Sequence, residues 1–311
     1  MDRFDLGDVQ IIRIPELLSP AVAPHAFLAN LPEDAVQRHQ GWLEPHFYDI
    51  ASGQLILSGH AWLIKTPRNN ILVEACGGNH KPRPAFPRTH MLETPWIERL
   101  AQAGCTPDDI DFVLCTHLHV DHVGWFTSLD KGVWVPTFPR ARYLIDKVEY
   151  ANWNPATRSL PPLALNANCF EDSVTPVMES GLMTLVEPPL KVEDAVTLEP
   201  ARGHTLGHTA VRVNGSTRSA IISGDVTHTP LQIIYPQCCT IGCEDPIASN
   251  ATRRRLLDDC AATGALYMPT HYPSPYSAVS IARHGSSFRF ADSDGVEPAG
   301  LSEALARMAS D

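Results

Sequence analysis

The segment His117-Leu118-His119-Val120-Asp121-His122 carries three imidazoles and one carboxylate within six residues. Neutral imidazole nitrogens and carboxylate oxygens are the ligands that zinc and similar divalent ions take in proteins. In an extended turn, alternate residues can face the same point, so this spacing suits a shared cation. A lone histidine is usually a surface or hydrogen-bonded core residue, but that interpretation does not account for the whole cluster. The segment therefore predicts a metal site.

Buried strands are expected to position this site. The run from Phe112 to Thr116 is short, apolar and rich in β-forming residues, which is typical of a buried strand, and the histidine cluster starts where it stops. Two later runs have the same plan. Ser219 to Ser223 is predicted to be a strand that leads to Asp225, and Ala265 to Met268 a strand that leads to His271. Each strand end thus carries a candidate ligand.

Further elements can be placed around these strands. The apolar runs 55–65 and 71–75 flank a cluster of turn-forming residues and predict a β-hairpin. Thr94 as the N-cap, followed by a first-turn proline and an apolar face, predicts a helix that ends at Gly104. Residues 250–262 have apolar positions at roughly helical spacing and precede Gly264, which predicts a second helix between the two later strands.

Residues 135–200 differ from the rest of the chain, because they are rich in proline and weakly periodic. This pattern predicts a loop-rich insertion that forms a wall or a lid over the site. No low-complexity linker or internal repeat stands out, so we expect one domain over residues 1–311. Apolar residues at helical spacing in 301–308 predict a short packing helix or a homodimer contact.

Composition and charge exclude several classes of protein. A formal net charge of −11 would repel a polyphosphate backbone, and the basic cluster at 253–255 lies inside a helical pattern, so a nucleic-acid partner is not expected. No apolar run approaches the ~18 residues that span a membrane, and the first residues do not resemble a signal peptide, which predicts a cytoplasmic protein without a membrane partner.

The eight cysteines are unevenly placed and do not form the pattern of a disulfide framework. Most of them are expected to be reduced, small buried residues. Cys238, Cys239 and Cys243 form a tight group that could bind a metal, but no partner Cys-x-x-Cys and no histidine at zinc-finger spacing accompanies them.

The His-x-His-x-Asp-His motif after an apolar strand resembles the signature of the metallo-β-lactamase superfamily. The resemblance continues, in the family's order, in the segments 203–208, 223–225 and 270–271, and it covers residues 55–272. It implies an α/β fold, the αββα sandwich of the metallo-β-lactamase type, with the site in loops at one edge of the paired sheets.

The resemblance also implies a ligand set for two divalent metal ions. The first ion would be held by His117, His119 and His204, the second by Asp121, His122 and His271, and Asp225 would bridge the two. His119 favours the hydrolytic, zinc-like branch, because the di-iron flavoprotein branch typically has a carboxylate at that position. Zinc is the expected metal, with manganese, cobalt or iron as alternatives. His208 is interpreted as a structural residue that supports the ligands.

Two such cations would lower the pKa of a shared water from about 15.7 to near 7, so that a bridging hydroxide attacks the substrate carbonyl. Asp121 could orient this water or carry a proton to the leaving group. In length the chain resembles lactonases and organophosphate or ester hydrolases. We therefore expect a hydrolase of a small-molecule carboxylic ester, with a lactone first. The alternatives are a thioesterase, an iron-dependent persulfide-type oxygenase and a non-catalytic binding protein.

Several residues near the ligands leave two interpretations open. His228 stands where acyl-homoserine lactonases have a tyrosine that holds the substrate carbonyl, so it is either a catalytic hydrogen-bond donor or a loop residue without a role. Glu74 occupies a place where Asp is more usual, and its carboxylate is expected to bind a loop. The aromatic candidates are Trp125 and Phe126, as pocket or core residues, and Tyr235 and Tyr272, as phenolic donors.

Overall fold

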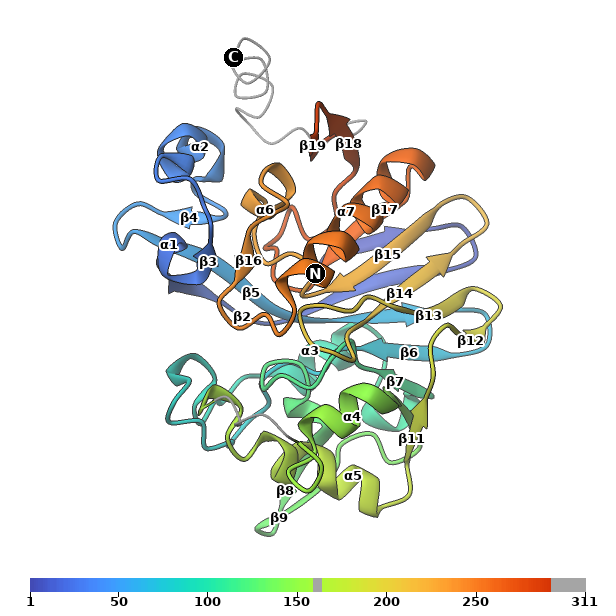
Figure 1. The fold of residues 1–311 in the computed structure, drawn as a ribbon. Coiled ribbons are helices and arrows are strands. Elements are labelled where there is room, and N and C mark those ends of the chain that lie inside the picture. The colour runs from blue at the N-terminus through green and yellow to red at the C-terminus, as the bar shows by residue number, and fades with distance from the viewer. Residues whose placement is uncertain (159–163, 292–311) are drawn as a thin grey trace.

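Two β-sheets lie face to face in the computed structural model, which describes residues 1–158 and 164–291, and helices cover their outer faces (Figure 1). The larger sheet has eight strands, β1 (Arg3–Asp5), β2 (Gln10–Val22), β4 (Tyr48–Asp49), β5 (Gln54–Lys65), β6 (Asn70–Val73), β7 (Phe112–Leu114), β10 (Arg142–Asp146) and β11 (Met183–Val186). The smaller sheet has five, β12 (Leu190–Glu193), β13 (Val196–Pro200), β14 (Thr209–Asn214), β15 (Ser219–Gly224) and β17 (Leu266–Pro269).

Shorter elements complete the described part of the chain. Three two-stranded sheets pair β3 (Leu28–Ala29) with β16 (Cys239–Thr240), β8 (Thr127–Asp130) with β9 (Val133–Pro136), and β18 (Ile281–His284) with β19 (Ser287–Phe290). The α-helices are α1 (Pro24–Phe27), α2 (Ala35–Leu43), α3 (Trp96–Gln102), α4 (Lys147–Trp153), α5 (Thr175–Glu179), α6 (Leu231–Ile234) and α7 (Pro246–Thr263).

Three apolar cores hold the layers of sheets and helices together. The central core fills the space between the two sheets and joins side chains such as Trp62 and Leu114 of the larger sheet to Val211 and Met268 of the smaller one. A second core packs the larger sheet against α3, α4 and α5, and a third packs the smaller sheet against α7. Because each sheet buries both faces, its strands are apolar on both sides. The predicted αββα sandwich is confirmed.

Most of the predicted elements around the site are present. The hairpin forms between β5 and β6, which pair antiparallel from Trp62 opposite Val73 to Lys65 opposite Asn70. Strand β7 is shorter than predicted, because its ladders with β6 and β10 include only Phe112 to Leu114. Helix α3 is capped by Pro95 rather than by Thr94, whose backbone N–H is held instead by the side chain of Asn79.

Helix α7 starts before the predicted residue 250. Asp245 is its N-cap, and the side chain of Asp245 accepts hydrogen bonds from the backbone N–H groups of Ile247 and Ala248. Gly264 ends the helix in the left-handed region, with a φ of 72°, as its position predicted. Within residues 1–158 and 164–291, no helix combines the length and the apolar composition that crossing a membrane requires.

The prediction of a loop-rich insertion over residues 135–200 is wrong for most of that stretch. Strands β10 and β11 belong to the larger sheet, and β12 and β13 start the smaller one. Three of the prolines lie at the ends of these elements, where they break no ladder. Pro136 is the last residue of β9, Pro176 lies in the first turn of α5, and Pro200 is the last residue of β13. The predicted helix at 301–308 lies outside the described residues.

Candidate metal centre

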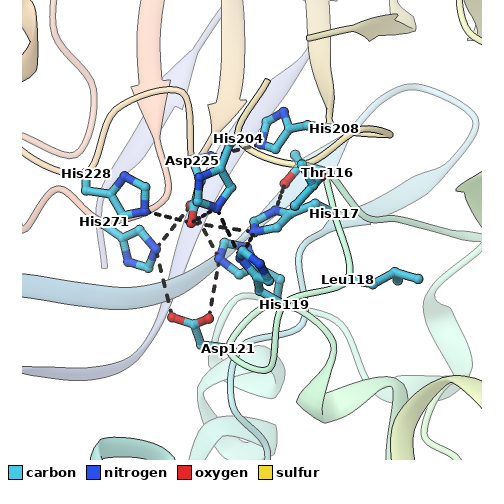
Figure 2. A network of polar contacts seen from close by, with 12 residues as sticks. Thr116, His117, Leu118, His119, Asp121, His204, His208, Asp225, His228 and His271 are labelled. Atoms are coloured by element: carbon cyan, nitrogen blue, oxygen red, sulfur yellow. Dashed lines mark hydrogen bonds and ion pairs between the residues drawn. The ribbon is translucent and has the colours of Figure 1, made fainter. Parts of the chain in front are cut away.

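The candidate ligands come together at one end of the two sheets, from the ends of several strands (Figure 2). The histidine cluster follows β7, Asp225 follows β15, and His271 follows β17. His204 comes from the loop between β13 and β14. These strands end at the same edge, so residues that are far apart in the sequence share one small volume.

Ligand atoms of His117, His119, His204 and Asp225 all lie within 4.8 Å of one another. His119 Nδ1 lies 2.9 Å from His117 Nε2 and 3.0 Å from His204 Nε2. All four side chains are buried. Three ring nitrogens that converge in this way, with an acidic oxygen beside them, form one side of a cation site.

A second group consists of Asp121, His122 and His271, whose ligand atoms also lie within 4.8 Å of one another. His122 Nε2 is 3.7 Å from Asp121 Oδ1, and His271 Nε2 is 3.9 Å from Asp121 Oδ2. The Asp121 side chain is 20% exposed, whereas that of His122 is fully buried. Asp121 is therefore the most exposed member of this group, and it lines the adjacent cavity together with His271.

Asp225 lies between the two groups and presents one oxygen to each. Its Oδ2 is 3.6 Å from His117 Nε2 and 3.3 Å from His204 Nε2. Its Oδ1 is 3.3 Å from His122 Nε2 and 3.1 Å from His271 Nε2. A carboxylate with its two oxygens turned to two sets of imidazoles has the arrangement of a bridging ligand.

Several polar atoms at this point have no hydrogen-bond partner in the described part of the chain. They include His122 Nε2 and Asp225 Oδ1, both buried, which lie 3.3 Å apart but form no hydrogen bond with each other. Burial lowers the pKa of His117 and of His119 well below the usual value, so these imidazoles are neutral and keep a lone pair for a cation. Buried acceptors without partners are costly unless an ion pairs with them, so the donor set fits divalent metal ions.

Glu74 orients two of the candidate ligands, His122 by direct contact and His117 through the Thr116 hydroxyl. Its Oε2 lies 3.1 Å from His122 Nδ1, and its Oε1 accepts a hydrogen bond from the Thr116 hydroxyl at 2.5 Å. The same hydroxyl is 3.0 Å from His117 Nδ1. Opposite, His271 Nδ1 lies 2.9 Å from the carbonyl oxygen of Ser58 in β5. These contacts turn Nε2 of each ring toward the centre, so Glu74 acts on ligands as well as on a loop.

Glu149 in α4 is a supporting residue that carried no signal in the sequence. Its carboxylate accepts hydrogen bonds from the Leu118 backbone at 2.8 Å, the Thr205 hydroxyl at 2.6 Å and the Gly207 backbone at 3.0 Å. The approach is close, because a Cβ atom at Gly207 would lie 2.1 Å from the Glu149 backbone nitrogen. Glu149 therefore ties the loop of His117 and His119 to the loop of His204.

Replacing Glu149 by Gln is expected to weaken metal binding by about 10- to 100-fold, the usual effect of losing an outer partner of a metal ligand. The amide cannot accept from all three donors, because its nitrogen is itself a donor. Competition of the purified protein with a zinc chelator measures the affinity. Glu179→Gln, which alters an exposed residue at the end of α5, is the matched control. Equal affinities of the two variants would contradict this role of Glu149.

His208 and His228 occupy different places relative to the candidate ligands. His208 Nε2 accepts a hydrogen bond from the Asp225 backbone N–H at 3.2 Å, which agrees with the structural role expected for it. His228 Nε2 lies 2.9 Å from Asp225 Oδ2, and its ring stacks on that of His271 with centroids 5.0 Å apart. His228 thus faces the centre directly, in a third possible group with Asp225 and His271.

A cavity of 530 Å³ opens onto the candidate ligands and has mainly apolar walls. Asp121 and His228, the two predicted catalytic residues, both line it. The volume suits a small organic molecule. The wall residues other than the histidines and aspartates are Ala21, Val22, Phe27, Leu57, Phe86, Pro87, Arg88, Leu165, Thr240, Ile241 and Gly242.

The aromatic candidates lie outside this cavity. Trp125 and Phe126 are buried in the core beside α3, where Trp125 stacks on Trp96 with centroids 5.4 Å apart, so they are core residues. The Tyr235 hydroxyl lies 3.0 Å from His39 Nε2, and Tyr272 is fully buried in the core beside α7. Neither tyrosine is among the residues that line this cavity.

The three cysteines at 238–243 belong to none of the potential metal groups among the described residues. Cys238 is part of the core beside α7, and Cys239 Sγ lies 3.8 Å from a guanidinium nitrogen of Arg253. The residues between Cys239 and Cys243 form part of the cavity wall. This segment therefore contributes to the pocket rather than to a metal site.

A paired-sheet sandwich with a His/Asp cluster at its strand ends defines a class of metal-dependent hydrolases. The profile of the Metallo-beta-lactamase superfamily matches residues 56–265, so the chain belongs to the metallo-β-lactamase superfamily. None of the curated proteins matches the chain.

Three solved structures of this fold are among those similar to this chain. The hydrolase AbOPH of the beta lactamase superfamily has a TM-score of 0.77 and 21% identity, over 95% of this chain and 98% of that chain. AidC, a dizinc quorum-quenching lactonase in complex with a product, has a TM-score of 0.72 and 18% identity, over 95% and 98%. A probable metal-dependent hydrolase from Staphylococcus aureus has a TM-score of 0.71 and 20% identity, over 94% and 100%. At these identities the likeness establishes the fold.

Proposed function

We propose that this protein is a dinuclear metal-dependent hydrolase that cleaves a carboxylic ester, with lactones as the first substrate class. The observation that carries the proposal is the placement of Asp225, whose Oδ2 faces His117 and His204 while its Oδ1 faces His122 and His271. A carboxylate in this position can serve two cations at once, and two adjacent cations are suited to hydrolysis.

The residues fall into two ligand sets in this proposal. His117, His119 and His204 would hold one ion, Asp121, His122 and His271 would hold the other, and Asp225 would be shared. We infer zinc, because imidazole nitrogen and carboxylate oxygen donors suit it, although manganese, cobalt and iron accept the same donors. The AidC neighbour is described as a dizinc enzyme, which supports this choice.

When bound, the two ions would supply a hydroxide at neutral pH and polarise the substrate carbonyl. Asp121, partly exposed in the cavity, would orient the attacking water and carry its proton to the leaving oxygen. His228 would donate a hydrogen bond to the oxygen of the substrate carbonyl as negative charge develops there. The apolar walls, such as Phe27 and Leu57, would limit the access of water and strengthen these interactions.

Two similar structures and the composition of the cavity favour an ester over other substrates. AidC and another similar structure, a Bacillus thuringiensis protein named AiiA, are described with an acyl-homoserine bound. The mainly apolar cavity suits an uncharged reacting group such as a lactone ring. A thioester carbonyl is open to the same attack, so a thioesterase is the second candidate.

The test is proton release in a pH-stat by the zinc-loaded protein, with a medium-chain acyl lactone and a matched thioester at equal concentration. Acid release from the lactone alone supports the proposal. Release from the thioester alone would move the protein to the thioesterase class. Silence on both would reject uncharged lactones and thioesters as substrates, and an iron-loaded preparation that consumes oxygen would then favour the persulfide-type oxygenase.

A further inference from the structure

Arg88 is the one arginine among the residues that line the metal-facing cavity, and no lysine lines it, within the described part of the chain. Its immediate neighbours in the sequence, Phe86 and Pro87, are apolar wall residues. The proposed chemistry at the metal ligands makes no use of this side chain. A half-buried guanidinium in a mainly apolar cavity is costly unless it has a partner there.

The protein holds the Arg88 side chain but leaves part of it free. A 3₁₀ turn, Pro87–Thr89, carries the residue. Its Nε donates to the Ser19 hydroxyl at 3.2 Å, and its Nη2 donates to the carbonyl oxygen of Leu57. Its Nη1 has no partner within residues 1–158 and 164–291. Two bonds thus fix the orientation of the guanidinium, and one NH₂ group remains for a ligand.

The charges around Arg88 also leave it without a counter-ion of its own. Burial lowers its pKa, and the carboxylates of Asp121 and Glu16 act in the opposite direction. Glu16 already accepts from the backbone of Gly77 and Gly78 and from the Trp125 indole. Asp121 would give its charge to a metal ion in the proposed centre. A positive group would then remain at the cavity wall.

We propose that Arg88 binds a carboxylate carried by the substrate, so that the ester cleaved here has an acyl or alcohol part ending in a carboxylate. This inference rests on the proposed function and deepens it. The reacting carbonyl would lie beside Asp121 and His228, and the distal carboxylate would pair with Nη1 of Arg88 across the same 530 Å³ cavity. Arginine suits this task because its planar donors match a carboxylate.

The test compares two esters that differ by one added distal carboxylate, 4-nitrophenyl butyrate and mono-4-nitrophenyl glutarate, with the zinc-loaded protein. Wild type is expected to prefer the glutarate in kcat/KM. In Arg88→Met this preference should fall by about 10- to 100-fold, the effect of losing one charged hydrogen bond. Arg88→Lys should recover part of it, and Arg88→Gln, which keeps a polar N–H group but no charge, should not. An unchanged preference in the Met and Gln variants would overturn the inference.

A binding measurement separates this inference from the proposed function. Calorimetric titration of the zinc-loaded protein with glutarate and with butyrate requires no hydrolysis. Glutarate is expected to bind at least about tenfold more tightly than butyrate to wild type, and equally to Arg88→Met. That result without ester cleavage would support the role of Arg88 and reject ester hydrolysis. Ester cleavage with equal binding of the two acids to wild type would overturn the role of Arg88 alone.

Discussion

Asp225→Asn is expected to lower kcat/KM by about 10³-fold or more and to reduce the metal content from two ions to one or fewer. The carboxylate presents its two oxygens to four imidazoles of both groups, at 3.1 to 3.6 Å. Loss of one preorganised electrostatic group typically costs about 10²–10³ in kcat. Here the change also removes a negative charge shared by two proposed cations, so the loss should be larger.

Metal analysis by mass spectrometry and kinetics at saturating zinc measure the two effects of Asp225→Asn together. Asp194→Asn, a change at an exposed ion pair with Arg68, is the control for loss of a surface carboxylate. Circular dichroism checks that both variants fold. If the Asp225→Asn variant keeps two ions and full activity, the basis of the dinuclear centre is removed.

Replacing His228 by Phe is expected to lower kcat by about 10²-fold or more while the protein keeps two metal ions. His228 lines the cavity and lies 2.9 Å from Asp225 Oδ2. Its backbone N–H is held by the Gln232 side chain at 2.7 Å, so the residue is well oriented. Loss of a single donor to a developing oxyanion costs about 10²–10³ in kcat. Phe keeps the ring that stacks on His271 and removes both ring nitrogens, and with them the contact to Asp225.

A tyrosine substitution at the same position tests whether donation is the property that matters. His228→Tyr places a hydroxyl on a similar ring, so it should recover part of the activity lost in His228→Phe. A fall in metal content in both variants would instead identify His228 as a metal ligand, in the group it forms with Asp225 and His271. Full activity of His228→Phe would leave the residue without a catalytic role.

The sequence predicted the strands that are recognisable from the composition of a few consecutive residues. Strands β7, β15 and β17 are short apolar runs, and a buried strand is recognised by such a run. Asp225 and His271 were candidate ligands because they lie at the ends of these strands, and the resemblance to the family gave them their places in the ligand set. His204 follows no such strand directly, so the resemblance to the family carried its assignment.

The many prolines in residues 135–200 led to a wrong prediction of loops, because a proline at the end of a strand or in the first turn of a helix does not disrupt that element. Pro136 and Pro200 end strands and Pro176 starts a helix. The 13-residue strand β2 was also missed. Its residues Pro15 and Pro20 look like strand breakers, although β2 pairs with β5 through two irregularities in register. Whether a segment that contains proline forms a strand depends on the strand it pairs with, and that partner cannot be read from one sequence.

The sequence by itself determined the type of chemistry, because four donors within six residues after a strand have few other uses. Only the tertiary structure decided how these donors are arranged. It turned one oxygen of Asp225 to each group, placed Glu149 between two ligand loops, and put Arg88 in the cavity wall. The reason is physical: a ligand motif is encoded by neighbouring residues, whereas the partners that orient and surround it are distant in the chain and meet only when the sheets pack.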